Sequence, residues 1–570
     1  MQKEKWILIN KGADFAGISE KFSIDPVIAR LIRNKDIVDE KEINTFLNGD
    51  LDMLYSPHLL KDADKAAGII KESIKKGERI HIIGDYDIDG IQSSYILYRG
   101  IEKAGGQVSV AIPDRIMDGY GINENLILQA YEQKIDVIVT CDNGIAAIEA
   151  IEYAKKLGMK VIITDHHEIP FVEEHGIKRE LKNTADAVIN PKQEKCSYPF
   201  KKICGATVAW KLIQALYDLM EIDGAMEYIE NAAFATIGDV MDLVDENRII
   251  VKFGLRKMRE TKNFGLQSLI ERKQIDRNAL SVYHIGFVLG PCLNASGRIS
   301  TAQRSLKLLL SENKTEADQI ALELDLLNEE RKEMTALGVK EAEDQIRSNE
   351  LFTDDIMIIY LPTLHESLAG IIAGRIRERY HHPVFVLTNA EHGIKGSGRS
   401  IEEYSMFEKM SEARHLMEKF GGHPMAAGLS LLHENLPNLK KYLNENSGLV
   451  PEDFVPKIKI DLHLPLSYVS KELIQQFSYL EPFGKGNTKP VFADRNIRIR
   501  SKRIIGKNKN VLRISIADNN GYSYQAIYFG EVEQMNAYLE DNTEVSILYY
   551  PELNVYQGIE SIQFILLGCQ

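Results

Sequence analysis

Residues 79–90 read RIHIIGDYDIDG, a short and mostly apolar run followed by a glycine and three closely spaced aspartates. A run of this length that ends in a glycine-acid turn is typical of a strand buried in a parallel sheet. Two later runs have the same form: DVIVT (136–140) leads into Cys-Asp-Asn-Gly, and KVIIT (160–164) leads into Asp-His-His. Stretches with helical spacing lie between them. This alternation predicts an α/β fold with a mostly parallel sheet and helices on both faces.

The same pattern continues on both sides of these runs. Further strands are expected at 107–112 and 185–189, and an amphipathic crossover helix is expected at 145–158. The sequence contains no internal repeat, so a single sheet built from successive strand-helix units is the simplest arrangement.

The sequence pattern changes twice in the C-terminal half. Residues 315–348 are highly charged and contain no proline, which predicts a long helix connecting two domains, although a solvated surface helix has the same composition. A second, smaller α/β unit follows, with apolar runs at 355–360 and 382–387. After Pro456 the sequence becomes strand-rich, and residues 512–529 alternate around an Asn-Gly pair that is typical of a hairpin turn.

Composition limits the class of protein. The 570 residues are too many for one core, so three or four domains are expected. No apolar run approaches the roughly 20 residues that cross a bilayer, and the N-terminus lacks the pattern of a signal peptide. The five scattered cysteines fit a reducing cytoplasm and argue against a disulfide framework. The net charge of −14 neither indicates nor excludes nucleic acid, because local patches set the field that a ligand meets.

Acidic and imidazole side chains follow three of the expected strands. Ligands of open parallel sheets bind beyond the carboxyl ends of the strands, so these side chains should converge on one rim. One aspartate alone would be interpreted as a turn former or helix cap. Five or more carboxylates at one rim repel each other unless cations lie between them. The candidates are Asp85, Asp87, Asp89, Asp142, Asp165, His166, His167 and, from a later segment (235–246), Asp239.

Divalent metal ions are the simplest way to hold such a set together. Mixed carboxylate and imidazole ligands favour Mn²⁺, with Mg²⁺ as the other possible ion, whereas a structural calcium site would use oxygen ligands only. A zinc site built from the same residues stays open but lacks a thiolate. Two ions about 4 Å apart would share a bridging water and stabilise charge on a phosphorus centre. The pattern therefore predicts a two-metal phosphoester hydrolase.

The three motifs GDYDIDG (84–90), DNG (142–144) and DHH (165–167) resemble, in order and spacing, the successive motifs of the DHH phosphoesterases. Ile83 stands where the wider superfamily often has a histidine, which leaves Asp85 as a substitute ligand and resembles the RecJ branch. The resemblance implies that the catalytic residues are Asp87, Asp89, Asp142, His166 and His167, and that the metal ligands are Asp85, Asp87, Asp89, Asp142, His166 and Asp239. His167 is then expected to contact phosphate or to support a ligand.

Two further segments of this region resemble substrate-facing motifs. The loop at 113–121 carries Arg115 and Tyr120, which are either phosphate or base contacts or part of a glycine-rich turn. The segment GPCLNASGR (290–298) resembles the RecJ signature GPR(I/L)NAAGR, with Cys292 in place of an arginine. By this resemblance Asn294 and Arg298 contact phosphate, and the missing charge at 292 removes one expected DNA contact.

The second α/β unit carries fragments that singly indicate only turns, because glycine clusters usually do. In the order His-Glu, GSGRS and GGHPMAAG they resemble the DHH-associated domain, DHHA1. The resemblance implies substrate contacts from this domain, and the guanidinium of an arginine can grip phosphate with two hydrogen bonds. The candidates are His365, Ser397, Arg399 and His423.

A basic segment at 485–513 contains ten Lys or Arg residues and one acid, Asp494. Basic strands with nearby aromatic side chains suit single-stranded nucleic acid, although lysine on an edge strand can also simply block aggregation. The preceding EPFGKGN (481–487) resembles the start of the oligonucleotide-binding (OB) domain of RecJ proteins. The expected platform residues are Arg498, Arg500, Lys502 and Arg503.

The resemblance as a whole implies a metal-dependent exonuclease that degrades single-stranded DNA from the 5′ end in DNA repair and recombination. The alternatives are a DHH phosphodiesterase for dinucleotides or short oligoribonucleotides, and a non-catalytic DNA-binding subunit. Single-stranded DNA, a helicase and a single-strand-binding protein are the candidate partners, with no membrane, in the cytoplasm. The expected domains are a lead-in (1–60), a DHH domain (61–275), a substrate motif with the long helix (276–348), a DHHA1-like domain (349–450) and an OB-like domain (451–570).

Overall fold

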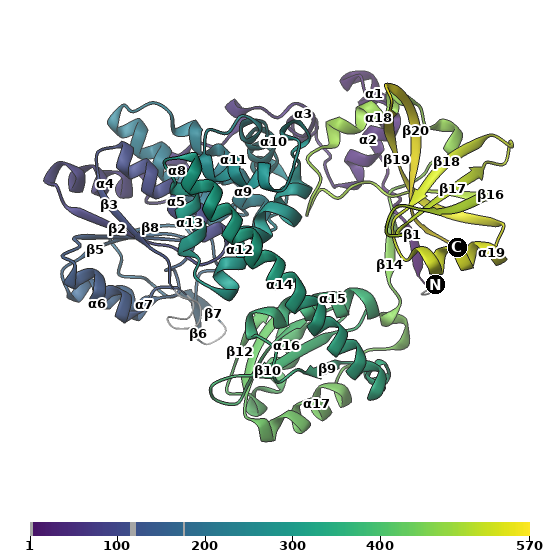
Figure 1. Ribbon diagram of the computed structural model, residues 1–570. Coiled ribbons are helices and arrows are strands. Elements are labelled where there is room, and N and C mark those ends of the chain that lie inside the picture. Colours follow the sequence, from purple (N-terminus) through teal and green to yellow (C-terminus); the bar gives the residue numbers. More distant parts are fainter. Residues whose placement is uncertain (1–3, 114–120, 175–176) are drawn as a thin grey trace. The chain divides into compact units, whose positions relative to one another are not determined.

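The computed structural model describes residues 4–113, 121–174 and 177–570 (Figure 1). The chain divides into two compact units. One contains the residues up to Ile7 together with Leu326–Lys459, and the other contains Leu8–Asp325 and Ile460–Gln570. Within the described residues, we find no helix with both the length and the apolar character that a bilayer crossing requires.

A five-stranded sheet organises the larger unit, and each neighbouring pair of strands is parallel. The strand order is β3-β2-β4-β5-β8, so the direction of winding reverses beside β2. Ligands of doubly wound sheets bind at such a reversal, beyond the carboxyl ends of the strands. The strands are β2 (Arg79–Ile83), β3 (Gln107–Ala111), β4 (Val137–Cys141), β5 (Lys160–Thr164) and β8 (Ala187–Ile189).

Helices cover both faces of this sheet, as the sequence predicts (Figure 1). One face carries α4 (Ala63–Lys76), α5 (Ile88–Lys103) and α8 (Gly205–Met220), and the other carries α6 (Glu124–Glu132) and α7 (Ile148–Lys156). The crossover helix expected at 145–158 starts later, because Asp142 and Gly144 adopt positive φ angles and keep the chain in a loop as far as Ala147.

Further helices extend this region. α9 (Ile229–Gly238) packs on α5 and α8, and α10 (Asp245–Arg259) packs on α9. A π-helical segment (His284–Leu289) runs directly into α12 (Gly290–Ile299). The remaining elements are the hairpin β6 (Phe171–Glu174) and β7 (Ile177–Glu180), α11 (Phe264–Arg272), α13 (Gln303–Leu310) and the expected long helix α14 (Lys314–Ser348).

The smaller unit is a five-stranded sheet of order β12-β13-β11-β10-β9, and its strand β10 shows how both faces are buried. Val384 and Val386 pack with α15, whereas Phe385 and Leu387 pack with α16 and α17, because successive residues of a strand face opposite sides. The elements are β9 (Met357–Tyr360), β10 (Val384–Asn389), β11 (Ile394–Arg399), β12 (Lys419–His423), β13 (Ala426–Leu431), α15 (Ala369–Tyr380), α16 (Met406–Glu412) and α17 (Leu436–Glu445).

The C-terminal strands form a closed barrel. Its order is β16-β17-β18-β20-β19, and β19 also pairs with β16. The expected hairpin around the Asn-Gly pair joins β17 and β18. The elements are β16 (Phe492–Ile505), β17 (Val511–Ala517), β18 (Ser523–Tyr528), β19 (Glu544–Tyr556), β20 (Ile559–Cys569), the short strand β15 (Leu462–His463), α18 (Lys471–Gln476) and α19 (Val532–Asp541). The strand β14 (Lys457–Ile460) is not part of the barrel and pairs with β1 (Lys5–Leu8) in a separate two-stranded sheet.

The N-terminal segment shares its core with this barrel. Ile28, Leu31 and Phe46 belong to the same buried cluster as Phe492 and Phe564 of the barrel. The segment is therefore part of the barrel's structure, rather than only a lead-in to the parallel sheet. Its elements are β1 (Lys5–Leu8), α1 (Phe15–Phe22), α2 (Pro26–Asn34) and α3 (Glu40–Asn48).

Candidate metal centre and substrate contacts

Asp87 and Asp89 are placed where β2 gives way to α5. Asp87 caps α5, since its Oδ1 accepts hydrogen bonds from the amides of Asp89 (2.9 Å) and Gly90 (3.1 Å). A side chain at Gly90 would collide with the backbone of Asp85, so glycine permits this tight turn. Asp89 lies in the first turn of the helix and is fully buried. The GDYDIDG motif therefore directs two carboxylates to the carboxyl end of β2.

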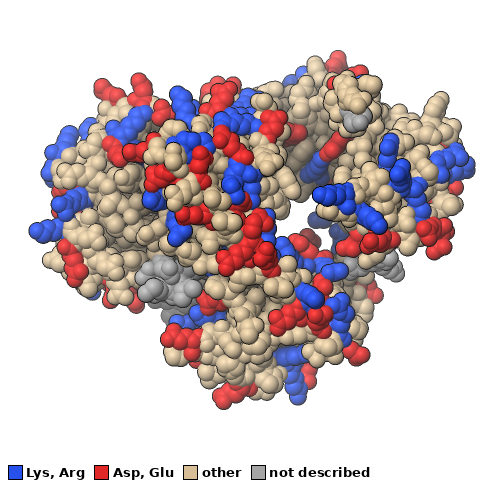
Figure 2. Space-filling view, in the orientation of Figure 1, with Lys and Arg blue, Asp and Glu red and all other residues tan. Residues whose placement is uncertain are grey.

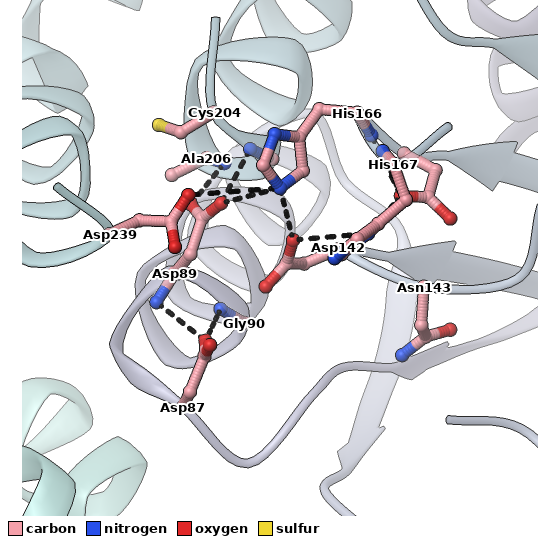
Figure 3. Close-up of polar contacts among 12 residues, drawn as sticks. Asp87, Asp89, Gly90, Asp142, Asn143, His166, His167, Cys204, Ala206 and Asp239 are labelled. Atoms are coloured by element: carbon pink, nitrogen blue, oxygen red, sulfur yellow. Dashed lines mark hydrogen bonds and ion pairs between the residues drawn. The ribbon is translucent and has the colours of Figure 1, made fainter. Parts of the chain in front are cut away.

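A helix N-terminus holds Asp89 in place. Its carboxylate accepts hydrogen bonds from the amides of Gly205 (2.6 Å) and Ala206 (2.7 Å), which begin α8 (Figure 3). The partial positive charge of a helix N-terminus stabilises such a carboxylate. A Cβ at Gly205 would lie 2.8 Å from Oδ1 of Asp142, so only glycine fits between the two acids. This contribution of α8 was not predicted from the sequence, although the glycine that opens the apolar stretch 205–220 was a signal of it.

Asp142 follows β4 in a strained backbone conformation, with φ of +60°. Its amide donates to the carbonyl of Thr164 on β5 (3.0 Å), which fixes the loop against the neighbouring strand. The side chain is buried, and burial together with the nearby charges of Asp89 and Asp87 raises the pKa of Asp142 well above its usual value. Such a group is stable as a carboxylate only when positive charge is near.

His166 lies at the centre of the acids (Figure 3). Its Nε2 is 3.1 Å from Asp142 Oδ1, 3.5 Å from Asp89 Oδ2 and 3.9 Å from Asp239 Oδ2. The ring is 8% exposed, and burial lowers the pKa of His166, which favours the neutral imidazole that binds metals. Its Nδ1 is buried and forms no hydrogen bond with any residue that the structure describes.

His167 is oriented by Asp165. Oδ1 of Asp165 accepts from the amides of both histidines and lies 2.7 Å from Nδ1 of His167, and its Oδ2 accepts from the amide of Ile145. Both oxygens of Asp165 are thus engaged in supporting the loop. Burial opposes protonation of His167, but the hydrogen bond to Asp165 dominates and raises the pKa of His167 to about 9. The side chain of His167 is 44% exposed, far more than that of His166.

Asp239 completes the rim from the end of α9. Burial and the charges of Asp89 and Asp87 raise the pKa of Asp239 to about 8. Among the described residues, three overlapping groups offer ligand atoms within 4.8 Å of one another. They are Asp142, His166 and His167; Asp89, His166 and Asp239; and Asp85, Asp87 and Asp142.

This donor set fits divalent metal ions. The structure brings together every ligand expected from sequence and adds His167 to them. The carboxylates are crowded and mostly buried, and Asp142 Oδ1 and His166 Nδ1 lack hydrogen bonds from protein groups. Oxygen and imidazole donors without thiolate suit Mn²⁺, and Mg²⁺ to a lesser degree.

Comparison with known proteins identifies the family. Three family models match in the expected order: the DHH family N-terminal domain at residues 79–237, the DHHA1 domain at 353–447 and the RecJ OB domain at 460–567. The proteins named single-stranded-DNA-specific exonuclease RecJ from Salmonella typhimurium and Escherichia coli are each 31% identical, over 95% of this chain and 95% of the relative. The chain belongs to the RecJ family.

Other relatives agree with this assignment. The Bacillus subtilis protein of the same name is 36% identical over 91% of this chain, and the chain spans 65% of that relative's length. The crystal structure of RecJ from Thermus thermophilus in complex with Mn²⁺ matches with a TM-score of 0.84 at 24% identity, covering 99% of this chain and 79% of that one. The corresponding complex with Mg²⁺ matches with a TM-score of 0.76 at 23% identity, covering 99% and 78%. The expected family and fold are confirmed.

The RecJ signature at 290–298 forms α12, close to the first acidic motif. A side chain at Gly297 would meet the carbonyl oxygen of Tyr86, so glycine allows α12 to approach that loop. Oδ1 of Asn294 is buried without a hydrogen bond. Cys292 is fully buried and its thiol donates to the carbonyl of Val288, so this position faces the core rather than a strand of DNA. Arg298 is half-buried at the end of the helix.

Arg115 and Tyr120 lie outside the described residues. In the smaller unit, Arg399 and His423 both lie opposite Ala426 in the sheet, one on each side, so the three side chains share a face. Ser397 lies two residues before Arg399 and shares that face as well. Across the neighbouring strands, Ser397 pairs with Gly428, and Gly428 pairs with Gly421. Because these glycines have no side chains, the face of the sheet beside Ser397 is open.

His365 and Arg399 have partners within the smaller unit. Nδ1 of His365 lies 2.7 Å from the hydroxyl of Ser367. Arg399 donates from Nη1 to the carbonyl of Gly398 (2.8 Å). Burial and the neighbouring Arg377 lower the pKa of Arg399. Of the DHHA1 candidates, Ser397, Arg399 and His423 lie on one face of the sheet.

The four expected platform residues differ in their surroundings. Arg498, Arg500 and Arg503 are exposed on β16, and Arg498 faces Glu544 at 3.5 Å. Lys502 instead donates to the carbonyl of Asn536 and lies 3.5 Å from Glu540, both on α19. The barrel side that carries β16 to β18 shows Lys and Arg side chains in Figure 2, with acidic side chains among them.

Proposed function

We propose that this protein is a two-metal exonuclease that hydrolyses phosphodiester bonds of single-stranded DNA, as the names of its RecJ relatives state of them. The observation that carries the proposal is the buried carboxylate and imidazole cluster at the carboxyl ends of β2, β4 and β5. Asp85, Asp87, Asp89, Asp142, His166 and Asp239 would hold the ions, which are Mn²⁺ by preference and Mg²⁺ otherwise. Bound there, the ions would activate water and neutralise charge on the reacting phosphate.

Other residues of the chain are assigned to contact the substrate or to hold the metal ligands in place. Asp165 orients His167 through its contact with Nδ1, and the exposure of His167 supports its assignment as a phosphate contact. Asn294 and Arg298 on α12 are assigned to the same substrate, next to the loop of Tyr86. Arg115, Tyr120, His365, Ser397, Arg399 and His423 are further assigned contacts. The α8 amides hold the Asp89 carboxylate in place through two hydrogen bonds.

The barrel favours single-stranded DNA over a dinucleotide as the substrate. Arg503 on β16 lies directly opposite Arg513 on β17, and both are exposed. Like charges opposite each other destabilise a sheet, so an anion such as a DNA phosphate would relieve this pair. Beyond Arg498, β16 pairs with β17 alone, so protection of an open strand edge is the alternative explanation for the charges of Arg500 and Arg503. Tyr522 and Phe529, 67% and 59% exposed, offer stacking surfaces nearby.

The two alternatives fit less well. A phosphodiesterase for dinucleotides needs no extended basic surface, and a silent binding subunit has no need to keep a complete set of ligands. All five cysteines are unpaired thiols, which supports the reducing cytoplasm as the location. The 5′ direction, the role in repair and recombination, and a helicase and a single-strand-binding protein as partners follow from the family resemblance and are part of the proposal.

Mn²⁺-dependent digestion of end-labelled DNA tests the proposal. We expect a 5′-labelled single strand to release labelled mononucleotide at once, and a 3′-labelled strand to release its label only at the end. A blunt duplex and a dinucleotide should be cleaved slowly. Faster turnover of the dinucleotide than of the strand would favour the small-substrate alternative, and no cleavage of any substrate would favour the binding subunit.

A further inference from the structure

The loop that follows Asp239 is held by a turn from the far end of the sequence. The amide of Leu243 donates to the carbonyl of Lys485 (2.7 Å), in the EPFGKGN segment before β16. Leu243 is buried, and a Cβ at Gly484 would lie 2.6 Å from its Cδ1. At Gly486, which has φ of +73°, a Cβ would lie 3.0 Å from that of Asp242. The two backbones are thus in direct contact.

The Asp239 loop needs such support. Val240, the next residue, has φ of +54°, a conformation that a β-branched residue adopts only under strain. The side chain of Val240 is 58% exposed, so its own packing does not hold the loop. The amides of Asp239, Val240 and Met241 donate to carbonyls near the end of α9, and Leu243 then joins this helix end to the turn.

The turn itself is rigid. Gly484 and Asn487 exchange backbone hydrogen bonds of 2.9 and 3.1 Å. The side-chain amide of Asn487 is buried and donates to the carbonyls of Leu480 (2.7 Å) and Pro482 (2.8 Å). These hydrogen bonds hold the turn together from within, so the turn can act as a fixed surface for Leu243.

A buried arginine attaches the turn to the helix beyond the loop. Arg248 on α10 donates to the carbonyls of Leu480 (2.9 Å) and Tyr479 (2.7 Å), just before the turn, and to that of Phe46 (3.2 Å). Its guanidinium also stacks on the ring of Phe46, 4.0 Å from the centroid. The Asp239 loop connects α9 to α10, and the turn contacts both this loop and α10.

Charge continues the contact toward the acids. Nζ of Lys485 lies 3.7 Å from Oδ1 of Asp242, whose other oxygen accepts from Lys202 at 2.8 Å. The turn thus also forms an ion pair with the loop that follows Asp239.

We propose that the turn 484–487 positions Asp239 for metal binding, so that the strand-binding barrel also maintains the metal centre. Within the proposed exonuclease function, on which this inference rests, Gly484 and Leu243 are positioning residues. The barrel segment is then required even for substrates too short to reach the basic strands.

Two variants test the contact from its two sides in the full-length protein. Gly484→Val forces a side chain against Leu243, and Leu243→Ala removes the packed group while leaving the turn intact. Gly12→Val is the matched control, because Gly12 lies in an exposed loop where an added Cβ meets nothing within 4 Å. Isothermal titration of metal-free protein with Mn²⁺ gives the affinity without any need for activity.

We expect each variant to bind Mn²⁺ about 10- to 100-fold more weakly, as is typical when the support of a metal ligand is lost. With Mn²⁺ below saturation, kcat for a trinucleotide should fall with KM little changed, and affinity for a long strand in EDTA should stay at the wild-type value. Wild-type Mn²⁺ affinity in Leu243→Ala would overturn the proposal, whether or not Gly484→Val folds. If the wild type binds Mn²⁺ but cleaves nothing, the proposed function fails, and the titration still decides this inference.

Discussion

Nε2 of His166 lies 3.1 Å from Oδ1 of Asp142, although the first follows β5 and the second follows β4. Neighbouring parallel strands bring the two together, since Cys141 pairs with Thr164 at their ends. Apart from this contact, neither Asp142 Oδ1 nor Nδ1 of His166 has a hydrogen bond within the described part of the chain. The pair therefore has the geometry of two ligands of one ion.

Asp142→Asn should remove hydrolysis and leave strand binding nearly unchanged. Loss of a ligand that serves two of the three groups should lower kcat by about a thousandfold or more, equivalent to roughly 4 kcal/mol. Release of nucleotide from a 5′-labelled strand measures the first effect, and fluorescence anisotropy with Ca²⁺ or EDTA measures the second. Wild-type turnover, in a preparation free of contaminating nuclease, would refute the assignment of Asp142.

The same variant should stabilise the metal-free protein. Removing one charge from the crowded acids relieves repulsion, and about 1 kcal/mol corresponds to a rise in Tm of roughly 2–4 °C for a domain of this size. With added Mn²⁺ the wild type should have the higher Tm of the two proteins, because it binds the ion more tightly. One site at a hundredfold excess of ion over Kd contributes about 2.7 kcal/mol to the free energy of unfolding. Calorimetry with and without Mn²⁺ measures both. An unchanged Tm in EDTA would mean that the acids are not mutually repulsive.

Gly205→Ala should impair catalysis although residue 205 carries no functional group. Its Cβ would lie 2.8 Å from Asp142 and would move the amides that hold Asp89. A loss of about 10- to 100-fold in Mn²⁺ affinity or kcat is expected for such a supporting residue. Gly68→Ala on α4, where an added Cβ meets nothing within 4 Å, is the control and should match the wild type. Full activity of Gly205→Ala would show that α8 does not set the position of Asp89.

Replacing Arg498, Arg500 and Arg503 by Ala should flatten the salt dependence of binding to a long strand. Each phosphate contact contributes a slope of about −0.7 for single strands, so a change of about 1–2 units is expected in the log–log slope. Lys502→Ala should leave the slope unchanged, because that side chain is bound to α19.

A triple variant of Lys65, Lys75 and Lys76, exposed on α4, controls for the change in net charge. Equal slopes for the two triple variants and the wild type would mean that the DNA path avoids the barrel. Cleavage of a trinucleotide should be unaffected in the barrel variant, since its exchanged side chains are exposed on β16 and not in the turn that contacts the Asp239 loop.

The sequence predicted the parallel sheet well because its strands are buried on both faces. The runs 79–83 and 160–164 coincide with β2 and β5, and their ends carry the acids that the structure brings together. Local sequence could not show that Phe46 shares a core with Phe492, because that contact joins distant parts of the chain and leaves no periodic signal.

The details of single side chains were also beyond the sequence. Simple alternation would place Arg498, Arg500 and Lys502 on one face of β16, but the register shifts between Ile499 and Ser501, and Lys502 turns toward α19. Cys292 replaces an arginine of the signature yet is buried, so charge alone does not explain that position. Both outcomes depend on packing between elements rather than on local pattern.

The account depends most on divalent ions bound by the acidic cluster being required for hydrolysis. The direct measurement is a titration of metal-free protein with Mn²⁺, following bound ions by electron paramagnetic resonance and nucleotide release from a single strand in the same samples. We predict two bound ions per chain, with release rising only as the second site fills, and neither effect in Asp142→Asn. Hydrolysis that persists in excess EDTA, or that reaches its maximum in Asp142→Asn, would contradict the account.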